Sequence, residues 1–172
     1  MTLGFSLYFD SRKKHPTHFP QKIIRSLDQA GFNAAEVAMI DDQAFEQIPG
    51  HTGATSLMPR KIHTIRLDEK SRWEAGKNIH FVIGNRTKDR YQFAPVVKCT
   101  GVQDVFMTYS SGNGLEISID GKYHYWRSGD LPMNDGFDSM EDFEAYFIRA
   151  CLRNNNDGCF SGKIIHWTDF RY

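Results

Sequence analysis

Hydrophobic residues recur with the period of an amphipathic helix in separate parts of the chain. Residues 21–32 carry their aliphatic side chains on one helical face and close on a glycine, a common residue just after a helix. Residues 34–48 extend this helical region. Residues 138–152 have apolar side chains at i, i+3, i+4 spacing, Ser139 or Asp138 as N-cap and acidic residues in the first turn. We therefore predict helices in these segments.

Strands fill most of the remaining sequence. Runs rich in β-branched and aromatic residues are separated by Gly, Asn and Asp. These runs are residues 3–9, 61–67, 78–85, 92–109, 115–121, 122–129 and 160–172. Asp120 and Gly121, where the run 115–121 meets the run 122–129, give the strongest short signal for a hairpin turn. The pattern predicts one α+β domain, with a mostly antiparallel, barrel-like sheet and two or three helices on its flanks.

Composition narrows the class of protein without identifying a function. The 172 residues suit a single domain, and 21 basic side chains balance 21 acidic ones. This balance argues against a strong non-specific grip on nucleic acid but is compatible with a local basic groove. The 3 cysteines show no CxxC spacing and the 7 histidines are scattered, so we expect reduced thiols, no metal site and no cofactor. The sequence carries no signal-peptide or membrane-span pattern, and we expect a soluble cytoplasmic protein.

Polar residues within the run 61–67 are the first candidates for chemistry. Lys61, Thr64 and Arg66 offer a base, a nucleophile and a fixed cation. Lysine acts as a base only where burial or a neighbouring cation lowers its pKa, and Arg66 is such a cation. The alternative is a solvated strand edge, where Lys and Arg are common. Asp135, just before a predicted helix, is either a turn residue or the carboxylate of a site.

A second set of side chains suits the binding of a base or a phosphate. Arg72 and Trp73 can stack on a base, although a tryptophan that closes one end of a small barrel is the alternative. Arg86, Lys88 and Arg90 lie in one loop, which indicates either a phosphate clamp or a solvated turn.

The order of these elements resembles the ASCH domain, a member of the PUA-like β-barrel superfamily. The family pattern is a lysine, two residues and Thr-Ile-Arg, then Trp/Phe-x-x-Gly before a strand, and later an acidic-Gly-Phe segment that begins a helix. The matching residues are Lys61, Thr64, Ile65, Arg66, Trp73, Gly76, Asp135, Gly136 and Phe137. The resemblance runs from Lys61 to about Trp167, with residues 3–24 as the first strand and helix. The fuller motif is similar to that of phage or prophage members.

The resemblance also implies catalytic residues. In the ASCH enzymes that hydrolyse acetylated cytidine, a lysine is the base, a threonine is the nucleophile and a glutamate completes the set. Lys61 and Thr64 match the first two positions. The third position, the acidic one, is matched by Asp135 or, in another alignment register, by Asp138.

From this resemblance we expect a single PUA-like domain over residues 1–172, with an insertion at about residues 26–60. Its cleft, built around Lys-x-x-Thr-Ile-Arg, is expected to recognise a nucleobase in RNA, in single-stranded nucleic acid or in a modified nucleoside. If it binds nucleic acid, Arg66 and the cations of residues 86–90 are expected to line one groove. The first alternative is an amidohydrolase that acts on N-acylated cytidine nucleosides. The second is a phage accessory protein that binds a host protein.

Overall fold

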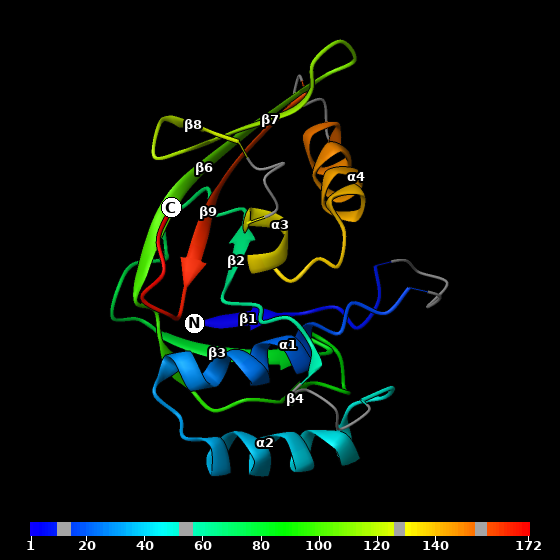
Figure 1. The fold of residues 1–172 in the computed structure, drawn as a ribbon, viewed down its shortest axis with the longest axis vertical. Helices are drawn as coiled ribbons and strands as arrows, with labels where there is room; N and C mark the ends of the chain where they lie inside the picture. The colour runs from blue at the N-terminus through cyan, green and yellow to red at the C-terminus, as the bar shows by residue number, and fades with distance from the viewer. Residues whose placement is uncertain (10–14, 52–56, 126–129, 154–157) are drawn as a thin grey trace.

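The strands that the structure describes form two sheets (Figure 1). A computed structural model describes residues 1–9, 15–51, 57–125, 130–153 and 158–172. The five-stranded sheet follows the long axis of the view in Figure 1, and the four-stranded sheet crosses its lower end. No helix of the described residues is both long enough and apolar enough to cross a membrane.

The four-stranded sheet begins with the first residues of the chain. Its strands are β1 (Thr2–Gly4), β3 (Asn78–Ile83), β4 (Tyr91–Gln92) and β5 (Val97–Lys98). β1 pairs in parallel with β3, and β4 and β5 each pair antiparallel with β3. The predicted run 92–109 is divided in the structure, because Pro95 has no N–H to donate to a ladder and separates β4 from β5.

The five-stranded sheet is antiparallel and follows the order β2-β9-β6-β7-β8. Its strands are β2 (His63–Arg66), β6 (Gly101–Ser110), β7 (Gly114–Ile119), β8 (Lys122–His124) and β9 (Cys159–His166). Asp120 and Gly121 form the turn before β8 with φ of 49° and 75°, as the predicted tight hairpin requires. β9 ends at His166, earlier than predicted. Residues 126–129 of the predicted strand 122–129 lie outside the described residues.

The predicted segments contain α1 (Phe19–Ser26), α2 (Ala34–Gln47) and α4 (Met140–Cys151). The 3₁₀ helix η1 (Leu27–Ala30) continues the first segment, and the short α3 (Asp130–Asn134), which was not predicted, precedes α4. Asn33 and Glu36 form a capping box at the start of α2. The Asp142 N–H donates to Oγ of Ser139 at 3.0 Å, which makes Ser139 the N-cap of α4. Gly31, with φ of 98°, ends η1 as the sequence predicts.

Two hydrophobic cores of the described residues meet at β9. Ile165 belongs to the core shared with the four-stranded sheet and α1, whereas its neighbour Ile164 belongs to the core under α4. This division follows from the alternation of side chains along a strand. Phe19, at the start of α1, packs against both cores. The segment that enters β2 therefore lies at the boundary between the cores.

The predicted α+β class is confirmed, but the described strands form two open sheets and not one closed barrel. β1 is short and pairs with β3 alone among the described strands. A side chain, and not a backbone ladder, links it to the other sheet: Nη2 of Arg66 donates to the Gly4 carbonyl at 2.9 Å.

The packing of α4 on the five-stranded sheet gives a direct test of the fold (Figure 1). Phe143 is 0% exposed, so Phe143→Ala should lower the free energy of unfolding by about 3–5 kcal/mol through the cavity it leaves. Met140→Ala, on the exposed side of the same helix, should change it by less than about 1 kcal/mol. Urea unfolding followed by circular dichroism measures both. A loss below about 1 kcal/mol for Phe143→Ala would mean that this face is not buried.

Candidate functional site

A buried ion pair joins Lys61 to Asp135. Nζ of Lys61 lies 2.7 Å from Oδ1 of Asp135 and also donates to the main-chain carbonyl of Asp135. The two residues are 1% and 4% exposed. The same carboxylate oxygen accepts the N–H of Ile65 at 3.2 Å. Nζ lies 4.6 Å from the ring centroid of Phe19, so a carboxylate and an aromatic face together surround the ammonium group.

The backbone around each partner holds the pair in place. Lys61 lies two residues before β2, and its N–H donates to the Lys22 carbonyl at 3.0 Å. The N–H of Ile62 donates to the carbonyl of Asn134, also at 3.0 Å. On the carboxylate side, Gly136 has φ of 85°, and a Cβ there would lie 2.9 Å from Cδ of Lys61. Glycine is therefore required at this position by both conformation and space.

Burial and neighbouring charges shift the pKa of both partners downward. Burial lowers the pKa of Lys61 to about 8, with Asp135 opposing this shift and Arg66 adding to it. For Asp135, burial opposes ionisation, but the Lys61 charge and the neighbouring His63 hold the pKa of the carboxyl below its usual range. The pair is thus ionised at neutral pH, and Lys61 loses its proton only slightly above it.

Thr64, the third candidate catalytic residue, is placed differently. It lies in β2, pairs with Ile165 of β9 and is 3% exposed. Lys61 lies outside this strand, so strand alternation does not fix how the two side chains face each other. Asp138, the rival acidic residue, pairs with Lys22 at 2.8 Å and has a half-exposed side chain. The geometry selects Asp135 as the partner of Lys61.

Further polar residues surround this pair, and no pattern in the sequence identified them as part of a site. His63 Nε2 lies 2.8 Å from the Tyr172 hydroxyl, which also accepts a hydrogen bond from Nδ2 of Asn134 at 3.1 Å. Nδ1 of His63 lies 3.7 Å from Oδ1 of Asp135. The ring of His166 is 5.3 Å from that of His63, and burial lowers the pKa of both histidines. A chain of polar side chains therefore leads from Asn134 to the ion pair.

Lys22 is a second buried lysine close to the pair. It is 1% exposed, and its Nζ donates to the Gly136 carbonyl at 2.7 Å as well as to Asp138. Burial lowers the pKa of Lys22. The sequence gives a signal for the burial of Lys22, because this residue is next to Ile23 in an amphipathic segment. The apolar face of that segment is buried in the structure.

A cleft of about 710 Å³ opens beside the ion pair, between β1, the turn after β2 and the loop after β3. We call it the Arg66 cleft. The predicted binding residues that line it are Arg66, Arg72, Trp73 and Arg86. Lys88 and Arg90 are exposed in the same loop as Arg86 but do not line the cleft. Lys61, Thr64 and Asp135 do not line it either.

Phe5 connects the Arg66 cleft to the ion pair. It lines the cleft, and its ring centroid lies 4.9 Å from Cζ of Arg66 and 5.9 Å from Nζ of Lys61. Nε of Arg66 is buried and has no hydrogen-bond partner within the part of the chain that the structure describes. One aromatic ring of the cleft lining is therefore close to two cations, Arg66 and Lys61.

Two turns present the cationic walls of the Arg66 cleft. The carboxylate of Asp68 accepts the Trp73 N–H at 2.8 Å and lies 3.6 Å from Nε of Arg72. Burial opposes the ionisation of Asp68, but the Trp73 and Arg72 N–H groups hold the pKa of this carboxyl below its usual range. Arg86 adopts φ of 69°, a left-handed conformation that costs a non-glycine residue about 1–2 kcal/mol. Such strained residues cluster at binding sites.

The chemistry of the cleft is that of binding an anion or a planar ring. Guanidinium groups bind phosphate and stack on aromatic rings. The Trp73 indole and the Phe5 ring line the cleft as parts of the hydrophobic core and are 7% and 5% exposed. No group of His, Cys, Asp and Glu suited to a metal ion occurs among residues 1–9, 15–51, 57–125, 130–153 and 158–172. Comparisons of the chain with protein-family models, with curated protein sequences and with solved structures found no match in any of the three.

The ion pair predicts an asymmetric response to mutation. Lys61→Met should lower the free energy of unfolding by about 3–5 kcal/mol, because it leaves the Asp135 carboxylate buried without its cation. Adding Asp135→Asn should recover most of that loss, because the amide removes the charge but keeps an oxygen for the Ile65 N–H.

Chemical denaturation of the single and double variants measures this cycle. Lys70→Met, at an exposed lysine, is the matched control and should stay within about 0.5 kcal/mol of the wild type. A Lys61→Met variant as stable as this control would show that the pair is not buried in solution.

Proposed function

We propose that the chain is an ASCH-type domain of the PUA-like superfamily whose cleft recognises a nucleobase, in a nucleoside or in a short single-stranded nucleic acid. The observation that carries this proposal is the convergence of Arg66, Arg72, Trp73 and Arg86 on one cleft, from β2, the turn after β2 and the loop after β3. Proteins that recognise single-stranded nucleic acid commonly place cationic side chains along its phosphate backbone and aromatic rings against its bases.

The size and charge of the protein favour a short ligand. A volume of about 710 Å³ falls in the range of small-molecule sites. The formal net charge of +0 supplies no extended positive field for a long polyanion. The cationic cleft is thus a local feature on a neutral protein.

The contact between two separate parts of the family motif supports the ASCH assignment. Lys61 and Asp135 lie 74 residues apart in sequence and form an ion pair, and Gly136 lies against the Lys61 side chain. Phe137 follows at once and lies 2% exposed in the core under α4. In this proposal the two open sheets together correspond to a PUA-like barrel. The Arg66 side chain joins the two sheets through its hydrogen bond to β1.

The exposed arginines of the cleft allow a controlled binding test. Arg72→Gln and Arg86→Gln should each weaken binding of a single-stranded RNA oligomer and lower the slope of log K against log salt by about one unit. Lys88→Gln and Arg90→Gln, which remove the same charge from the same loop outside the cleft, should leave that slope nearly unchanged. Fluorescence anisotropy at several salt concentrations measures the slopes. Equal losses in both sets would mean that binding is non-specific and not located in the cleft.

An amidohydrolase is the second candidate function, favoured by the pairing of a carboxylate with a lysine whose pKa falls to about 8. In that reaction Oγ1 of Thr64 bonds to the acyl carbon while neutral Lys61 takes the hydroxyl proton. The carbon–nitrogen bond then breaks, the protonated Lys61 returns the proton to the leaving amine, and water hydrolyses the acyl-threonine. Because both residues are buried, the substrate would have to reach them past Phe5.

Incubation with acetylated cytidine tests this second function. The enzyme hypothesis expects release of cytidine by the wild type and its loss in both Lys61→Ala and Thr64→Ala, with Lys70→Met as the active control. Cytidine and acetylcytidine are separated by chromatography. Absence of turnover in a folded wild type that still binds nucleosides would exclude the hydrolase and leave a binding domain.

A further inference from the structure

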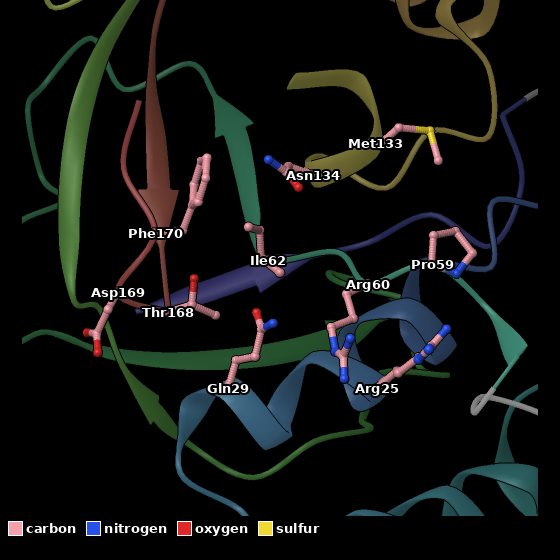
Figure 2. Close-up of a pocket in the computed structure, with 10 residues that line it drawn as sticks. All are labelled: Arg25, Gln29, Pro59, Arg60, Ile62, Met133, Asn134, Thr168, Asp169 and Phe170. Atoms are coloured by element: carbon pink, nitrogen blue, oxygen red, sulfur yellow. The ribbon is translucent and has the colours of Figure 1, made fainter. Parts of the chain in front are cut away.

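A second cavity, of about 590 Å³, lies between α1, α3, the segment before β2 and the residues after β9 (Figure 2). We call it the Thr168 cavity. It shares no lining residue with the Arg66 cleft. Its volume falls in the range of sites for small organic ligands. None of the residues predicted from the sequence to bind a ligand lies in it.

A buried hydroxyl without a partner points to a ligand in this cavity. Thr168 is 3% exposed, and its Oγ1 has no hydrogen-bond partner within the described residues. The backbone of Thr168 is fixed, because its carbonyl accepts hydrogen bonds from Nη1 of Arg171 at 3.0 Å and from the Thr100 hydroxyl. An unpaired buried hydroxyl is destabilising unless something else pairs with it. A polar group of a ligand in the cavity meets this need.

The adjoining residues suit a planar ring with a polar edge. Figure 2 shows Phe170, Asn134, Ile62 and Thr168 in one part of the cavity lining, with Phe170 above Thr168 and Ile62 beside them. Nδ2 of Asn134 donates to the Tyr172 hydroxyl at 3.1 Å, which orients the amide and leaves its carbonyl oxygen as an acceptor. Phe170 is 38% exposed and offers a ring face, and Ile62 is 7% exposed and offers an apolar one. Side-chain amides and aromatic faces are the usual partners of a nucleobase.

Two arginines supply a place for an anion on the other side of the cavity. Arg25 of α1 and Arg60 of the segment before β2 lie close to each other in Figure 2. Arg60 forms a bidentate ion pair with Asp28, in which Nε donates to Oδ1 at 3.2 Å and Nη2 donates to Oδ2. No ion pair of Arg25 occurs in the described part of the chain. Asp169, the acidic lining residue, points away from the other side chains in the view. Arg25 therefore supplies the main charge for a phosphate, and the Asp28-paired Arg60 beside it supplies further N–H donors.

We infer that the Thr168 cavity binds a nucleoside monophosphate, distinct from any ligand of the Arg66 cleft. The base lies between Phe170 and Ile62, with its polar edge on the Asn134 carbonyl oxygen and the Thr168 hydroxyl. The phosphate lies on Arg25 and Arg60. A mononucleotide fits better than an oligomer, because the cationic groups stand at one end of a cavity of about 590 Å³ and do not form a track.

Calorimetric titration of the full chain with AMP, CMP, GMP and UMP tests this inference. At least one monophosphate should bind, and both Arg25→Gln and Thr168→Val should weaken it by about tenfold or more. Thr168→Val is nearly isosteric and removes an unpaired hydroxyl, so the variant should unfold at the same temperature as the wild type or higher. Arg72→Gln, in the other cleft, should leave monophosphate affinity unchanged.

Three results would overturn the inference. The first is no binding of any monophosphate to the folded wild type at millimolar concentration. The second is binding that Arg25→Gln and Thr168→Val leave intact, or that Arg72→Gln removes, because the ligand then lies elsewhere. The third is inorganic phosphate that binds as tightly as the nucleotides, because the ring then contributes nothing. Loss of the Arg66-cleft function alone would leave these results unaffected, since the variants lie in separate sites.

Discussion

The buried ion pair between Lys61 and Asp135 is the contact on which the rest of the structure depends. It ties the segment entering β2 to the turn between α3 and α4, across the boundary of the two cores. Two charges in an apolar interior are tolerated only when each satisfies the other, so the pair fixes both segments relative to one another. The ion pair also explains the glycine at position 136, because the Lys61 side chain occupies the space where a Cβ would lie. Lys22 repeats the arrangement by pairing with Asp138 across the same turn.

Polar or cationic contacts lead from this ion pair to both cavities. Toward the Arg66 cleft, Lys61 and Arg66 lie on the same Phe5 ring. Toward the Thr168 cavity, His63 and the Tyr172 hydroxyl connect the Asp135 carboxylate to the Asn134 side chain. The ion pair is therefore in contact, through one or two side chains, with the walls of both sites.

The sequence predicted the elements of this fold better than their pairing. The helices and the Asp120–Gly121 hairpin were predictable because periodicity, capping and turn residues act over a few positions. The parallel pairing of β1 with β3 was not, because its partners are far apart in sequence and leave no local trace. For the site, the choice between Asp135 and Asp138 needed the structure, which pairs Asp135 with Lys61 and Asp138 with Lys22. The Thr168 cavity was missed because its residues come from separate elements and form no motif.

The titration of the Lys61 amino group tests the central claim most directly. In protein labelled with ¹⁵N-lysine, the side-chain Nζ resonance is followed by NMR from pH 6 to 11, and Lys61→Met identifies the signal. An ordinary lysine titrates near 10.5, and burial beside Asp135 and Arg66 should bring Lys61 to about 8. Removal of the opposing carboxylate charge in Asp135→Asn should lower this value further. A Lys61 that titrates near 10.5 and does not respond to Asp135→Asn would contradict the buried ion pair and the site built around it.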